Sequence, residues 1–200
     1  MKRAALLILL ACSSPVYLYD GQYVLDCWGD SLTAGSPGPP AESYPAVIED
    51  RYGANFETHN YGVPGETSTQ VAERVTPADS SSSIGVFWVG RNNFAAYDAV
   101  LRDVNQMRQR YKRFVIISIL NGDTEPAGTE AYRQIARLNF SLLLSYPYNF
   151  LDVRGSLAHG TPDNVPDAKW RADNVHLNRE GYAEVARLVT DFVRSRRELQ

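Results

Sequence analysis

The chain has 200 residues, a formal net charge of −3 and a pI near 5.6. This length suits a single domain with one substantial core, and the hydrophobic share of 44% and charged share of 22% are ordinary for a globular protein. The mild acidity gives no reason to expect nucleic acid as a partner, and nothing in the composition indicates an oligomeric state.

Residues 1–20 have the organisation of an export leader and linker. A basic "MKR" precedes the apolar run "AALLILLA", which is too short to span a bilayer because a span needs roughly 20 residues. Loss of residues 1–11 would remove Lys2 and Arg3 and change the net charge from −3 to −5. We therefore expect an exported protein, in a bacterial periplasm or anchored to a membrane, with one domain over residues 21–200. The alternative is that residues 1–11 form a buried first strand.

The two cysteines, Cys12 and Cys27, leave three outcomes open. Residues 9–12 read "LLAC" and resemble a bacterial lipobox, in which the cysteine is acylated and tethers the protein to a membrane, although Leu10 is larger than the usual residue. Cys27 would then be a lone thiol that packs as a small hydrophobe in a strand. A Cys12–Cys27 disulfide is the competing prediction for an exported chain without a lipid.

Strand-like and helix-like segments alternate from residue 23 onward. Strands are predicted over 23–29, 55–62, 83–90, 113–120 and 148–153, and helices over 43–53, 68–75, 96–111, 128–146 and 178–198. Thr129 and Asn178 stand where side-chain N-caps are expected. Five strands separated by helices predict an α/β protein with a parallel sheet between two helical layers. Residues 154–172 show no regular pattern, and such a long loop is expected to border a substrate.

Three polar turns follow the first three predicted strands. Ser31 stands in "CWGDSLTAG", Gly62 in "NYGVPGET" and Asn92 in "GRNN", each just past the end of a strand. The carboxyl ends of parallel strands meet at one edge of a sheet, and ligands bind there. The sequence therefore predicts that these residues converge on one site.

Four short blocks give this pattern a family resemblance. They are "GDS" at 29–31, "NYGVPGET" at 60–67, "GRNN" at 90–93 and "DNVH" at 173–176. In this order and spacing they resemble the SGNH or GDSL-type hydrolases, which are esterases and acylhydrolases. The resemblance implies a three-layer α/β/α, flavodoxin-like fold with a five-stranded parallel sheet.

The resemblance also implies roles for individual residues. Ser31 resembles the nucleophile, His176 the base and Asp173 the acid that orients the imidazole. The backbone N–H groups of Ser31 and Gly62 and the side-chain amide of Asn92 resemble an oxyanion hole. The chemistry agrees, because a serine hydroxyl needs an adjacent base and histidine can take and return its proton near neutral pH.

Four further side chains could shape the substrate site. Asn93 stands where the family usually has Asp, and Arg91 could bind an anionic group or could instead face solvent or pair with an Asp. Asp30 would orient the first loop or cap a turn. Trp170 would border the acyl or alcohol pocket or pack as an ordinary aromatic.

These residues indicate a serine esterase that needs no cofactor, since no His, Cys or acidic spacing suggests a metal site. The absence of Gly-x-Ser-x-Gly around Ser31 argues against an α/β-hydrolase. No large apolar lid is evident, so short acyl esters, O-acetyl groups first, on a polar or carbohydrate carrier are the expected substrates. The alternatives are a lysophospholipase or thioesterase, and a non-catalytic envelope module that binds glycans.

Overall fold

A computed structural model describes residues 22–76 and 83–196 of the chain. Its sheet has five strands, in the order β2-β1-β3-β4-β5, and every neighbouring pair is parallel. The strands are β1 (Tyr23–Gly29), β2 (Phe56–Gly62), β3 (Ile84–Trp88), β4 (Arg113–Ile117) and β5 (Phe150–Leu151). The predicted fold class, a flavodoxin-like parallel α/β sheet, is confirmed.

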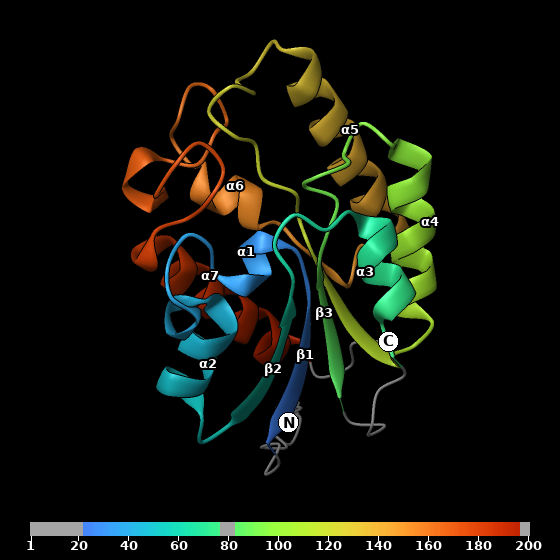
Figure 1. Cartoon of the computed structure of the whole chain (residues 1–200), viewed down its shortest axis with the longest axis vertical. Coiled ribbons are helices and arrows are strands. Elements are labelled where there is room, and N and C mark those ends of the chain that lie inside the picture. The colour runs from blue at the N-terminus through green and yellow to red at the C-terminus, as the bar shows by residue number, and fades with distance from the viewer. Residues whose placement is uncertain (1–21, 77–82, 197–200) are drawn as a thin grey trace, which may run out of the picture.

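Helices cover both faces of the sheet and give the molecule three layers (Figure 1). One face carries α2 (Tyr44–Tyr52), α6 (Val153–Leu157) and α7 (Arg179–Ser195), and the other carries α3 (Ser68–Arg74), α4 (Tyr97–Arg108) and α5 (Glu130–Ser145). Three short segments complete the elements: α1 (Ser31–Ala34) and the 3₁₀ turns Pro40–Glu42 and Ala168–Trp170.

Strand β3 shows why the helices can occupy both faces. All five of its residues are buried, which explains why its sequence is a continuous apolar run rather than an alternating one. Successive side chains point to opposite faces. Val86 and Trp88 join the core under α2 and α7, while Phe87 joins the core under α4 and α5. Each such burial contributes about 1.5–3 kcal/mol, so both faces must be covered.

The predicted helix starts are confirmed by their caps. The Thr129 hydroxyl accepts from the Tyr132 N–H at 3.1 Å, and the Asn178 side-chain oxygen accepts from the Gly181 N–H at 2.9 Å. The fifth strand is shorter than the predicted 148–153, because the Asp152 side chain caps α6 directly after it.

The expectation of an irregular loop over 154–172 is wrong at both of its ends. Residues 154–157 belong to α6, and Ala168–Trp170 form a 3₁₀ turn. An aspartate caps each segment, since the Asp152 carboxylate accepts from the Gly155 N–H and the Asp167 carboxylate from the Lys169 N–H. Hydrogen bonds of this kind, from a side chain to the nearby backbone, stabilise a single helical turn. Such a turn needs no amphipathic pattern, so the sequence pattern did not predict it.

The predictions for residues 1–20, including the leader, the alternative first strand and Cys12, lie outside the described residues. Cys27 lies within them as a free, fully buried thiol of β1, and burial raises its pKa to about 12. It packs as the small hydrophobe that was expected. Among the helices of residues 22–76 and 83–196, none is long and apolar enough to cross a membrane.

The strand order decides where a site can form. The chain leaves β1 for β2 on one side of the sheet and later returns to add β3 on the other side. A crevice opens at this switch point, outside the carboxyl ends of β1 and β3. Ser31 follows β1 and Asn92 follows β3, so the topology places these two residues beside each other.

Candidate active site

Ser31 lies at the first residue of α1, immediately after β1. The Asp30 carboxylate caps this helix by accepting from the Leu32 N–H at 3.0 Å. The cap turns the chain sharply, and Ser31 keeps a relative exposure of 8%. At this position the Ser31 N–H has no partner within the helix, so it is available to an incoming group.

The base and the acid reach Ser31 from the opposite end of the chain. His176 Nε2 lies 2.9 Å from Ser31 Oγ, and His176 Nδ1 lies 2.8 Å from Asp173 Oδ2. The separation of 145 residues is bridged because β1 and the loop before α7 end at the same sheet edge. The three predicted catalytic side chains are therefore assembled in hydrogen-bond reach of one another.

The loop before α7 holds Asp173 in its ionised form. Partial desolvation raises the pKa of Asp173, but the backbone N–H groups of His176 and Val175, each donating to Oδ1 at 2.8 Å, and the His176 ring outweigh it and lower that pKa to about 2. An ionised carboxylate only accepts hydrogen bonds, so His176 Nδ1 carries the proton. Nε2 is left to accept the Ser31 hydroxyl proton, as a general base requires.

Asn92 lies beside the triad and contacts two neighbours through Nδ2. It donates to the Glu66 carbonyl at 2.8 Å and approaches Asp30 Oδ2 at 3.4 Å. The second contact is at the long limit for a hydrogen bond, so an oxyanion on a substrate would compete for that proton. The predicted role of Asn92 as an oxyanion donor fits this geometry.

The structure does not support the predicted role of Gly62. Its N–H is engaged, since it donates to the side-chain oxygen of Asn60 at 2.9 Å. A Cβ at this position would overlap the backbone of Ala34 in α1. The glycine is thus required where β2 packs against the helix that carries Ser31, not where a substrate approaches.

Gly65, which the sequence reasoning missed, is better placed to donate. It has φ +83° and open space around its Cβ position, and the Glu66 N–H donates to the Val63 carbonyl across it at 3.3 Å. The next residue, Glu66, is the one that Asn92 contacts. The Pro-Gly pair in "GVPGET" was a usable signal, because a type II turn places glycine at this positive φ.

Asp30 combines burial with charge. It is 1% exposed, and burial raises its pKa to about 6, against the Leu32 N–H and the charges of Arg91 and His176, which lower it. Its two oxygens serve different partners, Leu32 in α1 and Asn92 after β3. The structure shows the alternative, that Asp30 caps the turn, and the role of Asp30 in orienting the first loop stays a prediction.

Arg91 and Asn93 are both committed to neighbours. Arg91 forms a two-pronged ion pair with Glu125, at 2.6 and 2.7 Å, and both side chains are 10% exposed. Asn93 accepts from the Ser68 N–H and donates to the Ser68 hydroxyl, which fixes the start of α3. Arg91 is therefore ion-paired, as one alternative expected, but its partner is Glu125 and not an aspartate.

Trp170 does not border the triad. It packs against the core between α2 and α7, and its carbonyl accepts from the Asn178 N–H at 2.9 Å. The alternative that it is a packed aromatic is therefore correct. The neighbouring residues in "DAKWRA" show no pattern that would distinguish a packed aromatic from one that lines a pocket.

A hollow lies on the segment that leads into the loop of Asp173 and His176. It has a volume of about 370 Å³ and is lined by residues 160–163 and 165–168 together with Arg171. The loop between Arg171 and His176 is held by the Ala172 N–H, which donates to the His176 carbonyl at 3.0 Å. The middle of the segment expected to border a substrate thus forms a concave surface next to the triad loop. Within residues 22–76 and 83–196, no three His, Cys, Asp or Glu side chains gather as a metal site would need.

The geometry carries acyl transfer through a covalent intermediate. Ser31 Oγ attacks an ester carbonyl while His176 Nε2 takes the hydroxyl proton and then gives it to the departing alcohol. Water, deprotonated by the same nitrogen, next attacks the acyl-serine and releases the acid. The Ser31 N–H, at the start of α1, and the Asn92 amide, which contacts Asp30, are donors that can stabilise the negative oxygen.

A parallel α/β sheet with this triad at its switch point defines a serine hydrolase that acts on carboxylic esters. The family model of the GDSL-like Lipase/Acylhydrolase family matches residues 27–184, and the chain belongs to that family. The predicted family and enzyme class are confirmed.

Solved structures agree with the fold. A member of the lipolytic protein G-D-S-L family from Veillonella parvula is 16% identical, with a TM-score of 0.68 over 86% of this chain and 97% of that one. The lipase/acylhydrolase from Enterococcus faecalis is 14% identical, with a TM-score of 0.68 over 88% and 97%. The esterase EstA from Pseudoalteromonas, solved with monoethylphosphonate, is 12% identical, with a TM-score of 0.66 over 87% and 98%. A search of curated proteins gives no match.

Proposed function

We propose that this esterase removes short acyl groups, O-acetyl groups first, from a polar or carbohydrate carrier. The observation that carries the proposal is the hollow on the segment that leads into the loop of Asp173 and His176, although none of the triad side chains lines it. Its lining includes Thr161, Asp163, Asp167 and Arg171, whose hydroxyl, carboxylates and guanidinium suit the hydroxyl groups of a sugar. A long acyl chain would instead need an extended apolar surface.

The Arg171 side chain is one anchor of this hollow. It pairs with Asp123 and keeps about a fifth of its side-chain surface exposed. Its Nε is a buried donor without a partner in the described structure. The exposed part of its guanidinium, rather than the buried Nε, is the part that a hydroxyl group in the hollow can reach, and a charged donor there favours a polar alcohol over an apolar one.

A panel of esters tests the proposal. We expect higher kcat/KM for p-nitrophenyl acetate than for the octanoate, and release of acetate from an acetylated polysaccharide. The Ser31→Ala variant should lose both activities, and a fluorophosphonate probe should label the wild-type chain but not Ser31→Ala or His176→Ala. A strong preference for the octanoate would support the lysophospholipase or thioesterase alternative instead.

The non-catalytic glycan-binding alternative predicts a different result with the same probe. A binding module has no need of an activated serine, so its Ser31 would stay unlabelled at neutral pH. The distances of 2.9 Å and 2.8 Å that join Ser31, His176 and Asp173 favour labelling.

We further propose that the chain is exported and that Cys12 is acylated. The support is the order of the basic, apolar and cysteine-containing segments in residues 1–15. Incorporation of radiolabelled palmitate into the wild-type chain, but not into Cys12→Ala, is expected. Absence of label on the wild-type chain would leave a free or oxidised Cys12.

A further inference from the structure

Two stretches of the chain contain basic residues and no acidic ones. Residues 104–122 and residues 131–151 have neither Asp nor Glu. Their basic residues are Arg108, Arg110, Lys112, Arg113, Arg133 and Arg137. Because the whole chain has a net charge of −3, the residues outside these two stretches are distinctly acidic. Charge is therefore unevenly distributed along the chain. A helix dipole explains a basic residue such as Arg108 in the last turn of α4, but not the basic residues that follow the helix.

An exposed apolar surface lies in the second of these stretches. Phe140, Leu143, Leu144 and Tyr148 are 60%, 40%, 65% and 72% exposed. They are four of the five large exposed hydrophobic residues among the described ones. The first three share the outward face of α5, at the spacing that a helix turn requires, while Leu142 on the other face is buried in the core.

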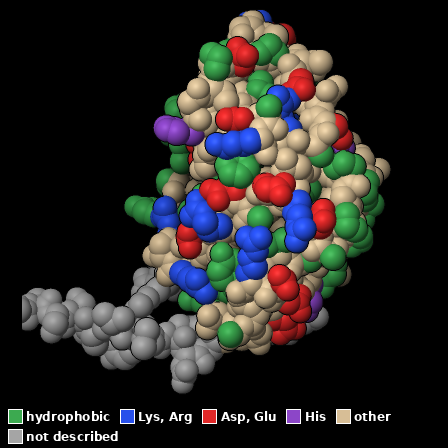
Figure 2. Space-filling model, turned by 90° about the vertical axis from the view of Figure 1, so that its left-hand side faces the viewer, with side chains coloured by type: hydrophobic (Ala, Val, Ile, Leu, Met, Phe, Trp, Pro, Cys, Tyr) green, Lys and Arg blue, Asp and Glu red, His purple; other side chains and the backbone are tan. Residues whose placement is uncertain are grey.

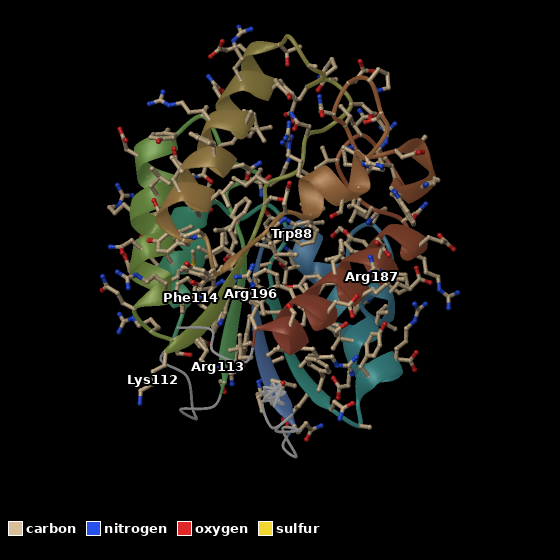
Figure 3. All side chains as sticks on the ribbon, turned by 180° about the vertical axis from the view of Figure 1, so that it is seen from behind. Trp88, Lys112, Arg113, Phe114, Arg187 and Arg196 are labelled. Carbon is tan, nitrogen blue, oxygen red and sulfur yellow. The ribbon has the colours of Figure 1, made fainter. Side chains whose placement is uncertain are left out.

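The basic and apolar groups adjoin each other. The rings of Phe114, at the start of β4, and Tyr146, just past α5, meet edge to face at 5.7 Å. The Asn149 side chain donates to the Phe114 carbonyl at 2.9 Å. Figure 3 shows Lys112, Arg113 and Phe114 following one another into β4 on this side of the molecule. We call the surface formed by Arg110, Lys112, Phe140, Leu143, Leu144 and Tyr148 the basic–apolar rim.

The rim lies at the sheet edge opposite the active site. Strand β4 begins at Arg113, whereas Ser31 follows the carboxyl end of β1, and the two strands are parallel to each other through β3. The Arg113 guanidinium lies over the Tyr23 ring, 5.9 Å from its centre. Tyr23 is the first residue of β1, so residues 1–21 join the described fold beside the rim.

The opposite helical layer has a different surface. Figure 2 shows acidic and basic side chains interspersed over the face that carries α2 and α7. Arg187 there pairs with Glu184 and Asp191 at 2.6 and 2.7 Å. Exposed apolar side chains beside basic ones are thus a property of the rim, because none of the large exposed hydrophobic residues among the described ones lies on α2 or α7.

We propose that the basic–apolar rim docks the protein on an anionic phospholipid surface. Exposed Phe, Leu and Tyr side chains insert at the boundary between headgroups and acyl chains, and Lys and Arg bind the lipid phosphates. The described fold begins at Gln22 and Tyr23, beside the rim, so an apolar anchor in residues 4–11 and the rim could engage one membrane. Docked in this way, the protein directs Ser31 away from the bilayer.

Vesicle binding of the full chain tests this proposal. The probe is vesicles of phosphatidylglycerol and phosphatidylcholine in equal parts, at low and at high salt. R110E/K112E should weaken co-sedimentation about tenfold or more at low salt, and F140S/L144S should weaken it at both salt concentrations. The control R51E/K169E inverts two exposed charges on the other layer, at α2 and before Trp170, and should bind as the wild type does.

All variants keep residues 1–21, so a difference between them reports the rim. Hydrolysis of p-nitrophenyl acetate should be unchanged in both rim variants, which shows that they fold. Wild-type binding by both rim variants would overturn the proposal, as would equal binding of the wild type to pure phosphatidylcholine. Binding of heparin but not of vesicles would overturn it as well, since the rim would then recognise an anionic polysaccharide.

Discussion

Replacement of Asp30 by Asn should stabilise the protein, and only at higher pH. Burial holds the pKa of Asp30 at about 6, about two units above the ordinary value of 3.8. Since one unit corresponds to 1.36 kcal/mol, ionised Asp30 costs about 3 kcal/mol of folding free energy at pH 8. Asn caps a helix about as well as Asp does, so D30N should recover most of this cost.

The sign of the pH dependence follows from the raised pKa. The folded protein binds this proton more tightly than the unfolded chain, so the wild type gains stability as the pH falls from about 6 to about 4. D30N has no such proton. Its advantage over the wild type should therefore be largest above pH 6 and should disappear near pH 4.

Urea denaturation followed by tryptophan fluorescence at several pH values measures this difference. D98N replaces an exposed aspartate in the first turn of α4 and serves as the control, with no comparable gain at pH 8. If D30N and the wild type differed by the same free energy at pH 5 and at pH 8, the assignment of a buried, costly charge to Asp30 would be refuted.

Three other changes test the surroundings of the site. Gly62→Ala should lower the thermal midpoint sharply, because the new methyl group meets the backbone of α1, and normal stability would contradict the close packing. Arg91→Ala should lower the free energy of unfolding, measured in urea, by about 3–5 kcal/mol, because it leaves the buried Glu125 carboxylate without its partner. Full stability with a raised KM would point to a substrate contact of Arg91 instead. His59→Gln should destabilise most at pH 5.5, since the hydrogen bond to Asp26 raises the His59 pKa and this contribution is lost as the pH rises through it. A difference in urea midpoint that does not change between pH 5.5 and pH 9 would contradict the His59 assignment.

The location of the triad could be predicted from the sequence because each member lies in a short block that resembles a block of a known family. Ser31 follows a buried strand, and Asp173 and His176 are close enough to meet within one turn of chain. The order of strands and helices then predicted one sheet edge for both ends. The distances of 2.9 and 2.8 Å confirm that step.

The roles of the glycines and charged residues near the site could not be read in the same way. Gly62 and Gly65 lie three residues apart in one block. The sequence does not show that the Gly62 N–H already donates to Asn60. Arg91 required a partner, but Glu125 is 34 residues away and reaches it only through the fold. Such choices depend on which groups the tertiary structure brings into contact.

The sequence by itself determined the layer order and the caps at Thr129 and Asn178, because these depend on periodicity and on residues near one another in the chain, while the resemblance of four short blocks to a known family implied the nucleophile, base and acid. Only the tertiary structure decided that Asp30 is buried beside Asn92, that Gly62 serves packing, and that α5 presents an apolar face next to a basic turn. Burial, hydrogen-bond competition and the neighbourhood of distant segments are properties of packed elements, and a linear pattern does not contain them.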